Sequence, residues 1–311
     1  MSAPEGESAA PDAPADNTTD LFGFAAALGA YGIWGLAVLF FKLLEAVPAT
    51  EIIAHRISWT VVFVGLWLIA KGRLGEVRAA VADPAVIFRL LASAVLIAGN
   101  WLIFVWAVSQ ARVLEVSFGY FINPLVNVAL GFVLLGERFS RLQGIAIAVA
   151  ALAVAVQATG LTGFPWVSLA LAFSFAFYGF LRKTVAVKPT PGLFVETLVL
   201  LPLALAYLGW LDVSGTGHFL ADPGRTVLLV LTGIITALPL VLFATGARRL
   251  PLSTVGILQY LAPSLHFLLA VFAFGEPLSP TRLVSFAIIW LSLAIFAADL
   301  LVRRRALRPQ G

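Results

Sequence analysis

Ten apolar blocks constrain the fold of this chain more than any other feature of its sequence. The blocks span approximately residues 21–41, 51–70, 88–109, 113–135, 141–159, 165–182, 192–211, 226–246, 252–274 and 281–302. A helix needs about 20 apolar residues to cross a bilayer, and in lipid each helix satisfies its own backbone hydrogen bonds. The blocks are continuous rather than alternating, which excludes a transmembrane β-barrel. The sequence therefore predicts an all-α polytopic membrane protein with ten transmembrane helices.

Composition excludes several other classes of protein. Hydrophobic residues make up 61% of the chain and charged residues 12%, whereas about a quarter of the residues in a soluble domain are charged. The chain has no cysteine and its three histidines lie far apart, so we expect no metal site. We also find no glycine-rich phosphate loop and no carboxylate cluster, which argues against catalytic residues and a cofactor.

Lysine and arginine are distributed asymmetrically between the connections. With a cytoplasmic N-terminus, the inside segments hold 15 of the 20 basic residues and the outside loops hold four. Basic residues concentrate on the cytoplasmic side of membrane proteins. We therefore predict two cytoplasmic termini, and we interpret the positive charge as a topology signal rather than a nucleic-acid site. Residues 1–20 lack the basic start of a signal peptide and are expected to be a disordered cytoplasmic tail. Residues 303–311 are expected to be a second cytoplasmic tail, rich in basic residues.

The chain also contains an internal repeat. Pro124 is followed 12 residues later by Gly136-Glu137, and Pro263 is followed at the same spacing by Gly275-Glu276. The two motifs are 139 residues apart, which relates block four to block nine. Each half, 21–160 and 164–302, then holds five helices, an odd number, so the second half enters the membrane from the opposite side. Such inverted repeats are typical of secondary transporters.

Polar side chains gather around these two matched prolines. Prolines inside membrane helices are candidate hinges, and we predict that role for Pro124 and Pro263, with a kink that serves only packing as the alternative. On block four, spacings of three and four place the polar residues on one helix face. Amides and imidazoles in lipid are costly unless they face inward, so we expect them to line a central cavity, with interhelical hydrogen bonding as the alternative. The residues are Tyr120, Asn123, Asn127, Gln259, Tyr260 and His266.

Ionisable and aromatic residues inside the blocks add further candidates. An ion pair of Glu196 with His55 or Arg56 would neutralise the charges and serve coupling, or else only lock helices together. Asp299 is expected to face water at the cytoplasmic end. Three further residues lie beside small or polar neighbours and could stack on a flat substrate. They are Trp34, Asn100 and Trp101.

Several stretches together resemble the RarD family, within the EamA group of the drug/metabolite transporter superfamily. The resemblance covers nearly all of residues 21–302. The matching stretches are Tyr31–Gly35, His55–Arg56 with Trp59, Gly99–Leu102 with Trp106–Val108, Gly119–Val126, Leu135–Phe139, Phe173–Gly179 with Arg182–Lys183, Glu196–Thr197, Leu252–Thr254, Gln259–Tyr260 with Pro263, and Phe286 with Trp290.

This resemblance implies a specific architecture and activity. It implies ten helices in two EamA repeats, a bacterial inner-membrane location, and a permease linked by name to chloramphenicol sensitivity. We therefore expect a secondary transporter whose partners are the lipid bilayer and a small organic substrate. His55, Glu196 and His266 are the candidate proton carriers. The alternatives are an intramembrane enzyme built on His55 and Glu196, and a membrane scaffold or sensor that transports nothing. The oligomeric state stays open.

Overall fold

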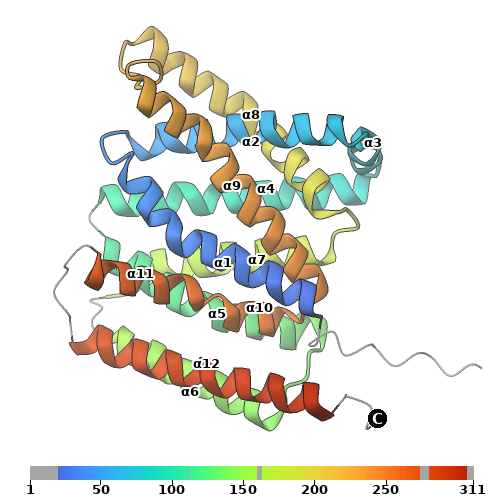
Figure 1. Ribbon diagram of the computed structural model, residues 1–311, viewed down its shortest axis with the longest axis vertical. Helices are drawn as coiled ribbons and strands as arrows, with labels where there is room; N and C mark the ends of the chain where they lie inside the picture. The colour runs from blue at the N-terminus through green and yellow to red at the C-terminus, as the bar shows by residue number, and fades with distance from the viewer. Residues whose placement is uncertain (1–19, 111, 160–162, 274–279, 307–311) are drawn as a thin grey trace, which may run out of the picture.

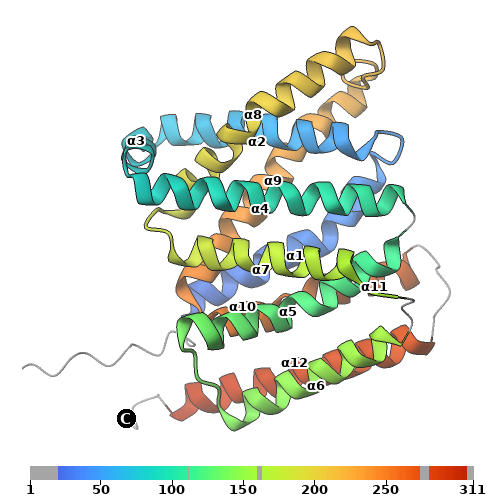
Figure 2. The ribbon, with the colours of Figure 1, turned by 180° about the vertical axis from the view of Figure 1, so that it is seen from behind.

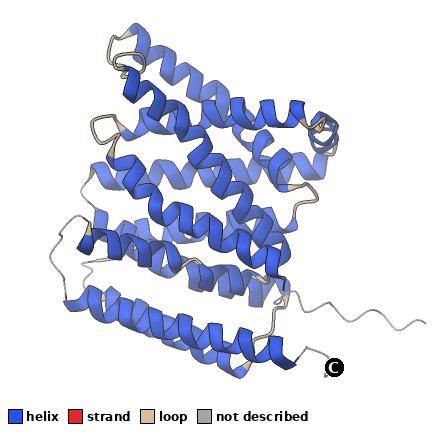
Figure 3. Cartoon of the chain, in the orientation of Figure 1, coloured by secondary structure: helices blue, strands red, loops and turns tan. Residues whose placement is uncertain are grey.

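The structure is a computed structural model that describes residues 20–110, 112–159, 163–273 and 280–306. Every regular element in these ranges is an α-helix (Figure 3). The elements are α1 (Leu21–Lys42), α2 (Ala49–Ala70), α3 (Leu74–Ala82), α4 (Pro84–Ser109), α5 (Val113–Leu135), α6 (Arg141–Ala158), α7 (Trp166–Thr184), α8 (Pro189–Val213), α9 (Pro223–Arg249), α10 (Leu252–Leu258), α11 (Leu261–Phe272) and α12 (Pro280–Ala306).

These helices confirm the predicted all-α membrane fold. Eight helical stretches are long and apolar enough to cross a bilayer, and α12 contains a further apolar stretch, Leu283–Asp299. Helix α7 is less apolar because Arg182 and Lys183 lie in its last turn. Nine of the predicted blocks correspond to one helix each, and the block 252–274 corresponds to α10 and α11 together. The short helix α3 was not predicted, because its nine residues lie in what was taken for a polar connection.

Local sequence signals explain where several helices begin. Asp20 accepts a hydrogen bond from the backbone N–H of Gly23 at 2.8 Å and so caps α1. Ser140 and Gln143 form a reciprocal capping box at α6. Both Asp-Pro pairs start helices, with Pro84 and Pro223 as the first residues of α4 and α9. The hydrogen bonds from Gly23 and from Arg249, 2.8 Å away, hold the pKa of Asp20 below its usual value.

The contacts between helices follow a two-fold pattern. The main contacts have counterparts between the corresponding helices of the other half. Helix α1 packs on α9, and the corresponding helix of the second half, α7, packs on α4. Likewise α5 packs on α7, and α11 packs on α1. The pairs α2–α8, α5–α10 and α6–α12 each map onto themselves. Figures 1 and 2 show α6 and α12 side by side at one edge of the molecule and α8 at the other. This pattern is that of two related five-span halves.

The matched prolines differ in their effect on the helices. Helix α5 runs unbroken across Pro124, whereas the corresponding segment breaks into α10 and α11 at Gln259 and Tyr260. A proline ring clashes with the carbonyl four residues earlier, which for Pro263 is that of Gln259. The break therefore lies one turn before the proline. The motif Gly275-Glu276 lies outside the described residues.

The bundle has two distinct ends. The start of α1 and the end of α12 lie at the same end as α3, which we call the α3 end (Figure 1). The connections α1–α2, α4–α5 and α8–α9 lie at the other, the far end. At the α3 end, the hydrogen bonds from Arg73 and then from Lys188 lower the pKa of Glu76 to about 2. These contacts fasten α3 to the start of α8.

Close contacts join α6 to α12 and α2 to α9. Ser140 donates a hydrogen bond of 2.7 Å to Asp299, which is only 4% exposed; the prediction that Asp299 faces water was wrong, because α12 turns this residue towards α6. Where α9 crosses α2, a Cβ on Gly233 would lie 2.5 Å from the carbonyl carbon of Trp59. The close approach of these two backbones therefore requires glycine at 233.

Candidate functional site

A cavity of about 390 Å³ lies between the two halves of the bundle. Most of its walls come from the second half of α1, the start of α2, the second half of α4, the first halves of α5 and α7, and the break between α10 and α11, and Leu240 of α9 completes them. All of these segments belong to the far half of the molecule. The structure brings together nine of the residues singled out in the sequence. They are Trp34, Arg56, Asn100, Trp101, Tyr120, Asn123, Gln259, Pro263 and His266.

A row of three amides, two of which line the cavity, joins the two halves. Asn127 donates hydrogen bonds to the side-chain oxygens of Asn123, at 3.0 Å, and of Gln259, at 3.1 Å. Asn123 in turn donates to the carbonyl of Ala172 at 2.7 Å. Gln259 thus accepts from Asn127, and its amide nitrogen donates to no acceptor in the described part of the chain. That nitrogen is a donor available to a ligand in the cavity.

Two other polar side chains offer acceptors to the same space. The amide nitrogen of Asn100 donates to the carbonyl of Leu171 at 3.0 Å and to the hydroxyl of Ser174 at 2.9 Å, which uses both its hydrogens. Its side-chain oxygen stays available. His266 Nε2 lies 3.2 Å from the carbonyl oxygen of Trp34. Because a carbonyl only accepts, Nε2 carries the proton, and Nδ1 of the neutral ring is an acceptor.

Aromatic rings make up much of the remaining wall. The Trp34 ring meets Phe175 edge-on at 5.8 Å and lies 5.7 Å from Phe243. Phe243 stacks on Tyr178 at 6.0 Å with an interplanar angle of 13°. This aromatic cluster fills the centre of the bundle on the side of the cavity nearer the α3 end.

Arg56 is the one Lys or Arg among the described residues that line the cavity. Its Nε donates to the hydroxyl of Thr236 on α9 at 2.9 Å. The guanidinium carbon lies 4.8 Å from the centre of the Trp101 ring and 5.4 Å from that of Phe41. These contacts hold the guanidinium between α1, α4 and α9 by stacking and one neutral hydrogen bond.

Four of the other predicted residues lie away from the cavity. Tyr260 is fully buried and donates to the carbonyl of Phe121 at 2.9 Å. Asn127, the third amide of the row, lies one turn below Asn123, and Pro124 lies within α5 against Gly256. His55 packs its ring on Phe219 at 4.8 Å. The prediction that Asn127 and Tyr260 line the cavity was therefore wrong in position; Pro124 was predicted as a hinge and His55 as a member of an ion pair.

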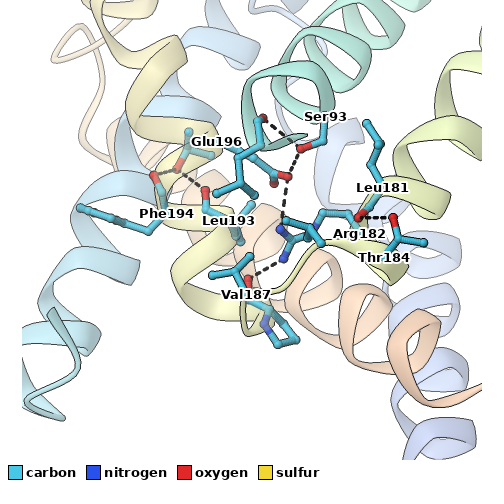
Figure 4. Close-up of polar contacts among 12 residues, drawn as sticks. Ser93, Leu181, Arg182, Thr184, Val187, Leu193, Phe194 and Glu196 are labelled. Atoms are coloured by element: carbon cyan, nitrogen blue, oxygen red, sulfur yellow. Dashed lines mark hydrogen bonds and ion pairs between the residues drawn. The ribbon is translucent and has the colours of Figure 1, made fainter. Parts of the chain in front are cut away.

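Glu196 does not pair with His55 or Arg56, which corrects that prediction. Its carboxylate faces Arg182 of α7, with 3.4 Å between Oε1 and Nη1, and both side chains are 1% exposed. Ser93 of α4 donates to the same carboxylate oxygen, and Arg182 Nη2 donates to the carbonyl of Pro189 at 2.8 Å (Figure 4). A Cβ on Gly192 would overlap the guanidinium. Glycine there lets Arg182 lie against the backbone of α8.

His55 instead belongs to a cluster around Glu51 at the far end. Glu51 is 1% exposed and accepts a hydrogen bond from the backbone N–H of His218 at 2.7 Å. Its other oxygen lies 2.8 Å from Nδ1 of the same histidine. His55 Nε2 is 4.0 Å from the carboxylate. The cluster ties α2 to the connection between α8 and α9.

Polar contacts close the bundle at the α3 end. Lys183 donates to the carbonyls of Ala247, at 3.1 Å, and of Leu250. Glu137, just after α5, accepts hydrogen bonds from the backbone N–H groups of Leu252 and Ser253 at the start of α10. A carboxylate in this position caps the helix and complements its dipole. The contacts of Glu137 join the two halves, and those of Lys183 join α7 to the end of α9.

Arg182, Ser93 and Glu137 were not predicted as members of polar networks; the first two are buried and Glu137 is half-buried. Arg182 was counted as a loop charge because it lies at the end of an apolar block. One signal was available: Gly192 and Glu196 are four residues apart and share a helix face. A small residue beside a buried carboxylate leaves room for a large cation.

Comparison with known proteins relates the chain to transporters. The model of the EamA-like transporter family matches twice, over residues 21–159 and 162–298. Protein RarD of Escherichia coli (strain K12) is 45% identical over 284 residues, which cover 91% of this chain and 96% of that protein. An uncharacterized transporter of Vibrio cholerae is 44% identical over 278 residues, 89% of this chain and 92% of the relative.

A solved crystal structure also matches, with a TM-score of 0.67 at 21% sequence identity over 93% of this chain and 99% of that one. At that identity the match concerns the fold alone. The family matches concern both halves and nearly the whole length. The chain belongs to the RarD-type proteins of the EamA-like transporter family.

Proposed function

We propose that this protein is a secondary transporter, a permease, that moves a small organic metabolite or drug-like molecule across the bacterial inner membrane. The observation that carries the proposal is the cavity between the two halves, with part-buried polar contacts at the α3 end of the bundle. Its volume, about 390 Å³, is within the range of small-molecule sites. Convergent amides among aromatic rings suit an organic molecule rather than a bare ion.

The geometry supports alternating access between the halves. The cavity lies in the far half, and polar contacts join the helices at the α3 end. The contacts α1–α9 and α4–α7 are counterparts in the two halves. If each took the geometry that the other has now, the cavity would face the α3 end instead. With no phosphate-binding loop in the sequence, we propose that a gradient or an exchange substrate drives the cycle. Of the three candidate proton carriers, His266 is the one that lines the cavity.

The two rival functions have less support. An enzyme built on His55 and Glu196 would need these groups together, but they have separate partners, Glu51 and Arg182. A scaffold or sensor needs no substrate-sized cavity between its halves. The relatives above also belong to a transporter family.

Replacing Gln259 with alanine is expected to lower transport at least several-fold without loss of folded protein. The substitution removes one interhelical hydrogen bond, worth about 0.6 kcal/mol in membranes on average, and the free donor in the cavity. Transport is measured in proteoliposomes with a metabolite mixture read by mass spectrometry. Ser292→Ala is the matched control, because it removes an interhelical hydrogen bond of 2.7 Å between α12 and α6, away from the cavity. Equal transport by both variants would mean that Gln259 only packs.

We also propose that both termini lie in the cytoplasm. The α3 end carries the start of α1, the end of α12 and the basic residues of α3 and the α7–α8 connection, and basic ends face the cytoplasm. Alkaline phosphatase fused between residues 160 and 164 should therefore be active, and a fusion after residue 302 inactive. Green fluorescent protein at the same sites should give the opposite pattern. A fluorescent fusion at 160–164 would contradict the proposed orientation.

A further inference from the structure

The guanidinium of Arg56 has no carboxylate partner in the described part of the chain. Neither Asp nor Glu is among the described residues that line the cavity, and the ion pairs found there do not include Arg56. The nearest acid on the same helix, Glu51, is engaged by His218. The buried acid of α8, Glu196, is engaged by Arg182 and Ser93. The cavity thus carries a fixed positive charge that the described protein does not neutralise.

A charge at membrane depth is costly unless it is paired. Arg56 uses Nε for Thr236 and the faces of its guanidinium for Trp101 and Phe41. The two terminal nitrogens donate to no acceptor in the described residues. They form the planar fork that matches a carboxylate with two parallel hydrogen bonds. The surroundings therefore fix the orientation of the guanidinium and leave its anion-binding edge available.

From this arrangement we infer that the cavity takes a monoanionic organic acid, with the carboxylate on Arg56 and an apolar or aromatic body against Trp34, Trp101 and Phe175. This inference rests on the proposed transport function and names its substrate class. One guanidinium balances one negative charge, so a phosphate dianion or a dicarboxylate would leave charge unpaired. Asn100 and His266 offer acceptors to a hydroxyl or N–H group on the body.

Binding of matched acids, amides and amines tests the inference. Equilibrium dialysis of the purified full chain with mass-spectrometric readout compares indole-3-acetate, phenylacetate and hexanoate with their primary amides and with tryptamine and phenethylamine. At least one acid is expected to bind about tenfold more tightly than its amide and than the amines, since a hydrogen bond to a charged group is stronger than a neutral one. If no acid exceeds its amide, the inference is overturned, whether or not the amide binds.

Three variants assign the preference to Arg56. Arg56→Gln should bind acid and amide equally, and Arg56→Lys should keep only part of the preference, because it keeps the charge but not the two parallel hydrogen bonds. Thr236→Val removes the contact of Arg56 with α9 but not the charge, so the preference should survive. Retention of the full preference in Arg56→Gln, or its loss in Thr236→Val with Arg56 intact, would contradict the assignment.

The anion site and the transport function can be refuted by different results. An acid that binds selectively but is not moved by proteoliposomes would refute the transport function and leave the anion site intact. Proteoliposomes that move neutral or cationic compounds, with no preference for acids, would refute the anion site and leave the transport function intact.

Discussion

Replacing Arg182 with methionine should lower the free energy of unfolding by about 3–5 kcal/mol, because it leaves the carboxylate of Glu196 buried without its cation. Both side chains are 1% exposed, and the pair joins α7 to α8. The free energy is measured by reversible unfolding in mixed detergent micelles, with thermal unfolding as a second measure. Glu196→Gln alone should also destabilise, because it strands the guanidinium.

The double variant Arg182→Met with Glu196→Leu decides the cause. Replacing a whole buried ion pair with apolar residues is often neutral or stabilising, so most of the loss should be recovered. Ser93 keeps a hydrogen bond to the carbonyl of Leu90 at 3.0 Å in this variant. A double variant as unstable as Arg182→Met would attribute the effect to lost packing instead.

Replacing Gly233 with alanine should destabilise the protein by about 1–3 kcal/mol, as overpacking of a close contact does. The new Cβ would lie 2.5 Å from the carbonyl carbon of Trp59 and 2.8 Å from its oxygen. Backbone atoms cannot rotate away as a side chain can, so α2 and α9 have to separate. The same movement lengthens the hydrogen bond from Thr60 to the carbonyl of Gly233, now 3.2 Å.

Gly144→Ala provides the matched control for this prediction. Gly144 also lies inside a membrane helix, and a Cβ added there meets no atom within 4 Å. Alanine should be neutral at 144 or stabilise by up to about 1 kcal/mol, because it favours the helix. Melting temperature and the yield of monodisperse protein are compared for both variants. Equal stability of the two would show that α2 and α9 shift freely at their crossing.

The fold could be predicted from the sequence because lipid leaves few alternatives. A run of apolar residues in a bilayer has to be a helix, and a paired proline pattern identified the repeat. On α5, Tyr120 and Asn123 line the cavity, as expected of polar groups that turn inward in lipid. Asn127 continues the same face but lies below the cavity, because face counting does not give depth.

The residues whose location or partner was predicted wrongly are those whose place depends on a partner on another helix or on a break in a helix. Tyr260 does not line the cavity, because it lies at the break between α10 and α11 and its hydroxyl donates to the carbonyl of Phe121 instead. The partner of Glu196 could not be read from the repeat, since matched positions in the two halves need not touch. Arg182 lies 14 residues earlier on the adjacent helix, where charge counting treats it as a topology signal.

The lone charge of Arg56 has an electrical consequence for a transport cycle. A site that is positive when empty becomes neutral when it holds a monoanion, so only the return of the empty carrier moves charge through the membrane field. A full unit charge is worth about 2.3 kcal/mol per 100 mV. An interior-negative potential draws the empty positive site towards inward access, where it loads from the cytoplasm. The membrane potential alone would then favour export over uptake, and collapsing it with an ionophore would slow net efflux.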